Sequence, residues 1–297
     1  IHLAAFIRLS RKNKTMSTER VTAYHSKNSS RGFLGSIIMF CSDFWNARFV
    51  IWFLFKRDFI AQFRQKLFGY FWIVIAPFMA VLPFIFLTKV GIFRPGDTDM
   101  PYPIFIVIGL GIWGLMTSCF SKISNSLQAN DDLIKRTNIP KITFAITELA
   151  NVLYHLLVHF MVVVVFVLIM GQSPSIWLLI YPLALLPIIL FSFGLGLLFS
   201  VIGTIARDLG NIVLSTLNLL LFISPVVYMP NFNHPLLSLV INWNPFTYLV
   251  DFPRAVLVLG EFRAEYGYLL SSLFSIALVL IGIHSFYLIK DKVAEQL

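Results

Sequence analysis

A stretch of the chain without any Asp, Glu, Lys or Arg runs from residue 149 to residue 206. A single helix crosses the hydrocarbon core of a bilayer with about 20 apolar residues, so this stretch is too long for one crossing. Turn-forming residues interrupt it at residues 171–175, which read Gly-Gln-Ser-Pro-Ser. The pattern therefore predicts two consecutive transmembrane helices, at residues 142–170 and 175–203.

The composition extends this prediction to the whole chain. Hydrophobic residues make up 58% of the sequence and charged residues 12%, whereas a soluble domain has about 45–50% and about 25%. Helices satisfy their own backbone hydrogen bonds inside a bilayer, so we predict an all-α polytopic membrane protein with six transmembrane helices. The other four uncharged segments of spanning length are residues 67–88, 101–121, 209–228 and 266–289.

The basic residues indicate how these helices are oriented. The chain has 23 Lys and Arg, and all but Lys89, Arg94, Arg254 and Arg263 fall in segments that the six-helix topology places on one side. This asymmetry is typical of the positive-inside rule, so both termini are predicted to lie in the cytosol. The same rule accounts for the net charge of +9 without a nucleic-acid partner.

The N-terminal part has no apolar core of signal-peptide type. Residues 1–39 are interpreted as a cytosolic tail, in which Met16 is a candidate for the native start, with the residues before it then partly non-native. Residues 40–66 mix Phe and Trp with Lys56, Arg57 and Asp58. This mixture is too charged for a stable crossing and favours an amphipathic helix in the inner membrane interface. Residues 67–297 then form the six-span domain.

A charged loop at residues 121–141 separates the second and third predicted helices. Its middle, residues 130–136, reads Asn-Asp-Asp-Leu-Ile-Lys-Arg, which begins with N-cap chemistry and ends with basic residues, as a short helix does. Pro140 stops any continuation. A short helix below a membrane domain is suited to contact with a soluble partner. The candidate contact residues are Asp131, Asp132, Leu133, Lys135 and Arg136.

Residues 229–265 form a second unusual segment. They are moderately apolar, yet Pro230, Pro235, Pro245 and Pro253 interrupt them. Two short helices that enter the outer leaflet and return fit this pattern better than one crossing. The segment is therefore predicted to be an outer re-entrant hairpin between spans five and six.

Four sequence patterns carry a resemblance to a known family. In their order and spacing they resemble the polysaccharide-export permeases of the type-2 ABC transporter superfamily, which export O-antigen, capsule and teichoic acid chains. The resemblance covers residues 55–297, although Gln62 and Phe63 stand where many members have Arg-Tyr. The patterns are Arg57-Asp58 with Gly69, Trp72 and Pro77; Tyr102-Pro-Ile-Phe with Gly109 and Trp113; residues 130–136 with Pro140; and Arg207-Asp208 with Ser224-Pro225, Asn244-Pro245 and Arg254.

The resemblance implies a permease subunit that moves a lipid-linked polysaccharide across the bacterial inner membrane. Such subunits form homodimers and dock two copies of a separate ABC ATPase, which binds ATP and Mg²⁺. Consistently, this chain has no P-loop sequence of its own, and no cofactor is expected on it. Further ATPase contacts are expected at Arg57, Asp58, Arg207 and Asp208, although the last two also fit a plain helix cap.

Aromatic residues are plentiful, with 30 Phe, 10 Tyr and 6 Trp. Most are expected to face lipid or to form interfacial belts. A minority are expected to line a translocation path, because aromatic faces suit the C–H faces of sugar rings and let a chain slide. The candidates are Tyr70, Phe71, Trp72, Phe78 and Tyr228.

A polar stripe is predicted on the third helix, where Glu148, Asn151, His155 and His159 recur at helical spacing. Polar groups facing lipid are costly, so the stripe should face protein or a hydrated cavity. Its histidines either hydrogen-bond neighbouring spans or touch hydroxyl-rich substrate in the translocation path. His155 and His159 have the spacing of a metal pair, but no third ligand accompanies them, so no metal site is predicted.

The alternative function is an integral-membrane enzyme, or a flippase without an ATPase, in cell-envelope glycan assembly. Such a protein should carry convergent Asp, Glu or His residues in one loop. Asp251 and Glu261 of the hairpin do not form such a cluster, and the sequence has no nucleophile elbow. No catalytic residue is therefore predicted, and Cys41 and Cys119 are too few for a disulfide framework.

Overall fold

The described part of the chain, residues 32–64, 71–206, 208–229 and 235–293, contains helices and no strands in the computed structural model. This confirms the all-α prediction. Five helical segments of the described part are long and apolar enough to cross a membrane. They are Phe33–Gln62, Tyr102–Ser124, Ile142–Ile169, Ile176–Gly203 and Glu265–Lys290.

These five helices overlap only in part with the six predicted spans. Four of them match the spans predicted at residues 101–121, 142–170, 175–203 and 266–289. The fifth belongs to α2 (Phe33–Arg64), which was predicted as an interface helix beginning at residue 40. The remaining two predicted spans correspond to shorter apolar helices, α3 (Phe71–Lys89) and α10 (Asp208–Ile223).

The break predicted at residues 171–175 lies where the chain turns between two helices. α7 (Ile142–Ile169) ends just before Gly171, which has a φ of +71° that glycine adopts without strain. The span predicted as one helix at residues 175–203 is divided into the 3-10 helix η2 (Ile176–Ile180), α8 (Tyr181–Ala184) and α9 (Leu186–Ile205). Pro182 and Pro187 lie in the first turns of α8 and α9, because proline fits a helix start but not its interior.

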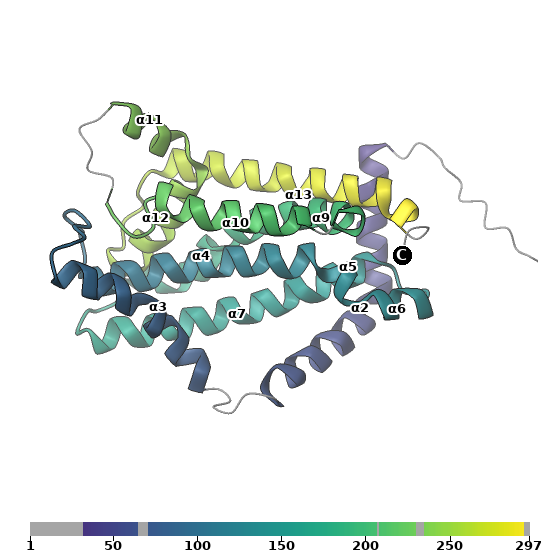
Figure 1. Cartoon of the computed structure of the whole chain (residues 1–297), viewed down its shortest axis with the longest axis horizontal. Coiled ribbons are helices and arrows are strands. Elements are labelled where there is room, and N and C mark those ends of the chain that lie inside the picture. Colours follow the sequence, from purple (N-terminus) through teal and green to yellow (C-terminus); the bar gives the residue numbers. More distant parts are fainter. Residues whose placement is uncertain (1–31, 65–70, 207, 230–234, 294–297) are drawn as a thin grey trace, which may run out of the picture. The chain divides into compact units, whose positions relative to one another are not determined.

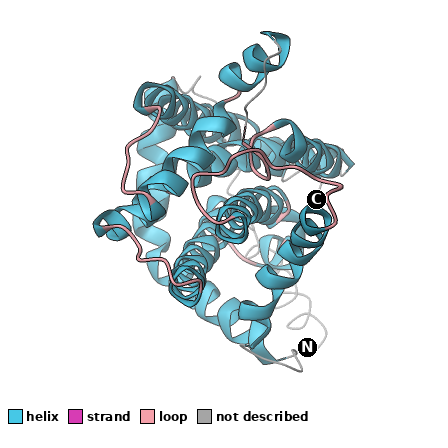
Figure 2. Cartoon of the chain, turned by 90° about the vertical axis from the view of Figure 1, so that its left-hand side faces the viewer, coloured by secondary structure: helices cyan, strands magenta, loops and turns pink. Residues whose placement is uncertain are grey.

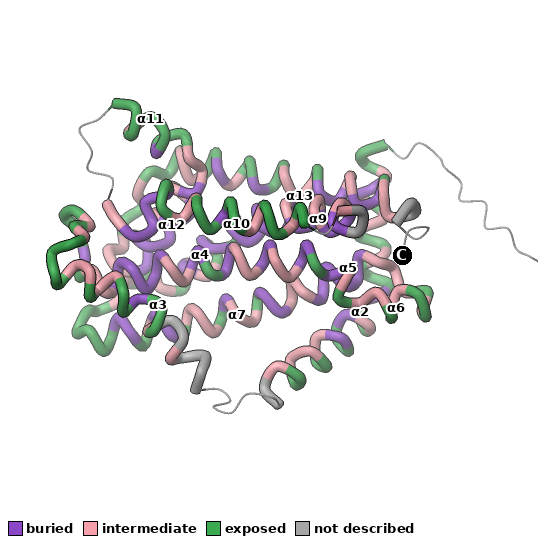
Figure 3. Tube along the Cα trace, viewed as in Figure 1, coloured by how far each residue is buried: buried purple, intermediate pink, exposed green. Residues whose placement is uncertain are grey.

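The core lies around α4 (Tyr102–Ser124), which packs against α3, α7, α9, α10 and α12. Its buried side chains include Ile104, Ile108, Ile112 and Met116, which follow one another at helical spacing and are inaccessible to solvent. Figure 3 shows this burial along α4, whereas α11 is mostly exposed. Figure 2, which views the chain from one end of the bundle, shows several of the helices end-on.

Among the described helices, α9 and α13 (Glu265–Val293) pack together most extensively. A Cβ atom added to Gly282 would lie 2.5 Å from the backbone oxygen of Gly194, and one added to Gly194 would lie 2.6 Å from the backbone of Leu278. Both positions therefore require glycine. Small residues that let backbones touch are a common device for packing helices in a bilayer, where the hydrophobic effect does not drive association.

The loops gather at two opposite ends of the bundle (Figure 1). At the hairpin end, named for α11 (Pro235–Trp243) and α12 (Pro245–Val258), the Met229 amide donates to the Pro95 carbonyl at 2.8 Å and the Ser175 amide donates to the Leu257 carbonyl at 3.0 Å. At the other end, the α6 end, lie α5 (Ser126–Ala129), α6 (Asp131–Arg136) and the last turns of α13. Lys141 there donates to the Lys290 carbonyl at 2.6 Å.

Candidate functional site: the α6 end and the polar stripe

The charged loop contains the short helix that its sequence predicts. α6 covers Asp131–Arg136, with acidic residues in its first turn and basic residues in its last, an arrangement that complements the helix dipole. Asp131 and Lys135 form an ion pair of 2.8 Å, one helical turn apart. Asp132, Lys135 and Arg136 are exposed. The helix therefore offers both signs of charge to a partner.

The start of α6 differs from the prediction. Asn130 occupies the N-cap position but accepts no capping hydrogen bond. Its side-chain amide donates instead to the Ser126 carbonyl at 2.9 Å, which satisfies an orphan oxygen of the preceding helix α5. The loop also begins later than residue 121, because α4 continues to Ser124.

The helix that precedes α6 connects it to the core of the bundle. Leu127 of α5 is inaccessible to solvent, and Gln128 donates to the backbone oxygen of Gly203 near the end of α9. Within α6, Leu133 is half-buried, and its carbonyl accepts a hydrogen bond at 2.6 Å from the hydroxyl of Thr137, which ends the helix. An external force on α6 would therefore reach α9 through α5, and α13 through Lys141.

The other predicted contact residues have different surroundings. Arg57 donates from Nε to the neighbouring Asp58 at 2.7 Å, near the end of α2. Asp208 is exposed in the first turn of α10, a position that suits a helix cap. Arg207 lies outside the described residues.

A polar groove lies between the end of α2, the junction of α4 with α5, and the start of α7. Its volume is about 560 Å³. Glu148 and Asn151 of the predicted stripe line it, and the Asn151 amide donates to Glu148 at 3.4 Å. Among the described residues, its lining comprises Asp58, Ala61, Gln62, Ser121, Lys122, Asn125, Ala129, Glu148 and Asn151.

The two histidines of the stripe lie further along α7 and pack against protein. His159 Nε2 lies 2.9 Å from the Tyr181 hydroxyl of α8. A Cβ atom added to Gly111 of α4 would lie 2.0 Å from the His159 ring, so glycine is required there. The His155 ring lies 5.5 Å from that of Tyr154. Among the described residues no cluster of three potential metal ligands occurs.

Only two of the five aromatic candidates for the translocation path have described side chains. Phe78 of α3 packs edge-on against Phe166 of α7, with ring centroids 5.2 Å apart. The Tyr228 hydroxyl donates to the Ile223 carbonyl at 2.9 Å, just after α10. Tyr70 and the side chains of Phe71 and Trp72 lie outside the described part.

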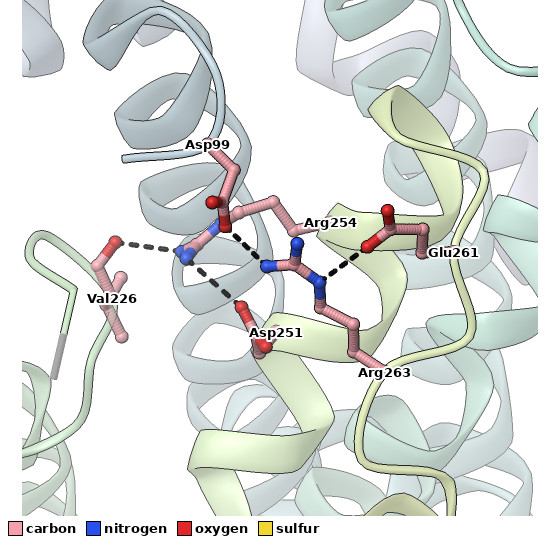
Figure 4. A network of polar contacts seen from close by, with 6 residues as sticks. All are labelled: Asp99, Val226, Asp251, Arg254, Glu261 and Arg263. Atoms are coloured by element: carbon pink, nitrogen blue, oxygen red, sulfur yellow. Dashed lines mark hydrogen bonds and ion pairs between the residues drawn. The ribbon is translucent and has the colours of Figure 1, made fainter. Parts of the chain in front are cut away.

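The hairpin end holds a buried cation whose surroundings the sequence did not reveal. Arg254 of α12 is only 1% exposed and donates from Nη2 to the Val226 carbonyl at 2.9 Å (Figure 4). Its guanidinium carbon lies 3.6 Å from the centre of the Phe105 ring. Its Nη1 is 3.8 Å from Asp251 Oδ1. Gly109 makes room for it, because a Cβ there would lie 2.5 Å from Arg254 Nη2.

A second arginine joins two loops at the same end. Arg263 contacts Asp99 of the loop before α4 and donates to Glu261 at 2.8 Å (Figure 4). The hydrogen bond to Asp99 raises the pKa of Arg263 above its ordinary value. Sequence position could suggest Asp251 and Glu261, which lie three and two residues from Arg254 and Arg263, but not Phe105 or Asp99, which are both more than 140 residues away along the chain.

Comparison with known proteins adds to this geometry. The sequence profile described as "ABC-2 type transporter" matches residues 50–258. The O-antigen export system permease protein RfbA of Klebsiella pneumoniae is 27% identical over 249 residues, which cover 82% of this chain and 92% of the relative. The polysialic acid transport protein KpsM of Escherichia coli is 24% identical over 241 residues, covering 77% of this chain and 89% of the relative. An O-antigen export permease of Myxococcus xanthus is 23% identical over 175 residues, covering 59% and 66%.

Proposed function

Because the chain belongs to the ABC-2 type transporter family, it is a membrane subunit that works with a separate ABC ATPase, and we propose that it exports a lipid-linked polysaccharide. The cargo is inferred from relatives whose names specify O-antigen export and polysialic acid transport. Members of this family are transport subunits, which sets aside the alternative of a membrane enzyme. The inferred location is the bacterial inner membrane.

The observation that carries the coupling role is the contrast within the α5–α6 loop. α6 exposes charges of both signs, while Ser126 and Leu127 of the preceding helix α5 are buried. A helix whose charges are exposed adds little to folding, so contact with a partner is the better use for them. The proposed ATPase contacts are Asp131, Asp132, Leu133, Lys135 and Arg136. Further ones are Arg57 and Asp58 on α2, Asp208 in the first turn of α10, and Arg207, which precedes Asp208 in the sequence.

The proposed topology has six crossings, by α3, α4, α7, the η2–α9 segment, α10 and α13, with both termini in the cytosol. α2 is proposed to lie in the inner interface, although its length would permit a crossing. Two observations support this placement. Its first half runs across the long axes of the bundle helices at the α6 end (Figure 1), and it carries Asp43, Arg48 and Lys56 along its length, charges that are costly inside a bilayer.

Contacts at the α6 end agree with this position of α2. The Tyr287 hydroxyl near the end of α13 donates to Asp43 at 2.7 Å, and Ser36 lies 3.1 Å from His284. Exposed Trp45 and Phe49 flank the Arg48 guanidinium at 4.8 and 4.5 Å. Amphipathic aromatic and basic groups of this kind prefer the membrane–water interface.

The transport path is proposed to form between two copies of the chain. Its candidate lining comprises Tyr70, Phe71, Trp72, Phe78, Tyr228, His155 and His159. The hairpin of α11 and α12 is proposed to enter the outer leaflet and return, since two helices of 9 and 14 residues are each too short to cross.

Deletion of the gene tests the function directly. The expected result is loss of one surface polysaccharide together with its accumulation inside the cell, and restoration by the intact gene. Co-purification of an ABC ATPase with the tagged chain is the matching biochemical result. A deletion strain with an unchanged surface glycan profile would contradict the proposed cargo, while leaving membership of the family intact.

A further inference from the structure

The exposed face of α10 differs from the exposed faces of α7 and α13. Every exposed residue of α7 is apolar, and so is every exposed residue of α13 between Leu269 and Leu288. α10 instead exposes Asn211, Ser215 and Asn218, from its first turns to beyond its middle. Figure 3 shows the exposed segments along this helix. We call these three residues the α10 strip.

The strip is the polar side of a face that also has an apolar side. Its members are separated by four and three residues, so they lie along one line of the helix. Ile212 and Leu219 are exposed as well, and each directly follows a residue of the strip. One residue turns an α-helix by about 100°, so these two side chains point in a different direction. α10 therefore presents a polar side and an apolar side to its surroundings.

Lipid is an unsuitable environment for the strip. Ser215 and Asn218 lie about 10 and 15 Å along the helix from Asp208, its first residue, at 1.5 Å per residue. The proposed crossing by α10 places them in the hydrocarbon region. Within the described part of the chain, no hydrogen bond satisfies the side chains of the strip, whereas the hydroxyl of exposed Thr216 donates to the Ile212 carbonyl at 2.9 Å. Unpaired amides and hydroxyls are costly in hydrocarbon.

Water suits the strip better than dry contact with a second copy does. A side-chain amide has two donor hydrogens and an acceptor oxygen, and a two-fold related copy would present the same groups in the same order. Buried polar groups are almost always paired, and water pairs any of them. The strip also begins one turn after Asp208, which is exposed. It therefore continues from the charged start of α10 toward the middle of the helix.

We propose that Asn211, Ser215 and Asn218 of α10 line a water-filled path through which the cargo crosses the membrane. The strip lies on the outside of a single chain, so this path is enclosed only when a second copy faces it. The inference rests on the proposed function, and it adds polar residues to an expected lining that is mainly aromatic. The apolar side of α10, with Ile212 and Leu219, faces away from the water.

Cysteine labelling of the assembled transporter tests the path. The native Cys41 and Cys119 are first replaced by Ser and Ala, and the chain is reconstituted with its ATPase in lipid nanodiscs, which leave both membrane faces accessible. A charged methanethiosulfonate reagent is applied during ATP hydrolysis. Ser215→Cys and Asn218→Cys are expected to react at least about tenfold faster than Leu219→Cys, because apolar surroundings disfavour the reactive thiolate.

Two further variants serve as lipid-facing controls. Leu157 of α7 and Ile281 of α13 are exposed and lie near the middle of their helices. Leu157→Cys and Ile281→Cys should react as slowly as Leu219→Cys. In cells, treatment of the Asn218→Cys variant with the same reagent should slow export, because the attached group obstructs the path.

Four results would overturn the proposal. Slow reaction at both Ser215→Cys and Asn218→Cys would place the strip in lipid. Disulfide formation between two Ser215→Cys chains without labelling would place it in a dry contact between copies. Equal rates for Asn218→Cys and Leu219→Cys would contradict the two-sided face, and fast labelling that leaves export unchanged would remove the strip from the path. A wrong cargo is a separate result, since an unchanged glycan profile in the deletion strain alters no labelling rate.

Discussion

At the hairpin end of the bundle, the charged residues of α12 and of the loop after it are buried or paired, whereas at the α6 end three of the four charged residues of α6, Asp132, Lys135 and Arg136, are exposed. Arg254 is 1% exposed and contacts Phe105 of α4 and Val226 after α10, as well as Asp251 of its own helix. Asp132 and Arg136 are exposed. Buried charges must have partners to be tolerated, so the hairpin charges hold the structure together, while the charges of α6 are available to another protein.

The largest effect is expected from reversing the charges of α6. Asp131→Lys with Asp132→Lys should reduce export at least tenfold and abolish co-purification of the ATPase, because both acidic contacts of the first turn are inverted. Folding should be unchanged, since exposed ion pairs contribute little to stability. The comparison is made by glycan surface labelling and pull-down.

Asp97→Lys provides the matched control, because Asp97 is also exposed but lies at the hairpin end. It should leave both export and ATPase binding unchanged. Native export in the α6 double variant would show that the acidic residues of α6 are not needed for contact with the ATPase.

The next effect is expected at the hairpin end. Arg254→Met keeps much of the side-chain volume but removes the donor to the Val226 carbonyl and the charge opposite Asp251. The expected loss of stability is about 2–3 kcal/mol, seen as a lower thermal unfolding midpoint in detergent. Arg94→Met, at an exposed arginine of the same end, should unfold at the native temperature; equal midpoints for both variants would contradict the role of Arg254.

A smaller effect is expected on α7, between the two ends. His159→Leu leaves the fully buried Tyr181 hydroxyl without its partner, at a cost of about 1–2 kcal/mol. His155→Leu, whose ring is half-buried, should cost less. If both variants instead slow export at native stability, His155 and His159 line the translocation path rather than making packing contacts only.

The smallest effect is expected for Arg263→Gln. Its ion pairs with Asp99 and Glu261 are partly exposed, so their loss should cost about 0.5 kcal/mol or less and should disappear in high salt. Because the pKa of Arg263 is raised above the ordinary value of an arginine, Arg263 stays charged between pH 6 and pH 9. The effect of Arg263→Gln should therefore not change over this pH range. A loss as large as that of Arg254→Met would erase the distinction between buried and exposed charges at this end.

Much of the local structure could be predicted because its causes are local. The short helix at Asp131–Arg136 and the pair of short helices at residues 235–258 follow from caps, charges and prolines within a few residues. The division of the fourth span was not predicted, although Pro182 and Pro187 were visible in the sequence. The predicted capping hydrogen bond of Asn130 was wrong. Its side-chain amide donates to the Ser126 carbonyl instead, an alternative that capping chemistry alone does not exclude.

The sequence by itself determined that this protein is helical, spans a membrane and presents a charged loop, because these properties follow from the distribution of apolar, charged and turn-forming residues along the chain. Only the tertiary structure decided which polar residues meet. Glu148 and Asn151 share a groove with Asp58, while His159 on the same stripe packs against Tyr181. Arg254 contacts Phe105, about half of the chain length away in the sequence. Such pairings depend on how distant helices pack, and a helical period records only which face a residue occupies.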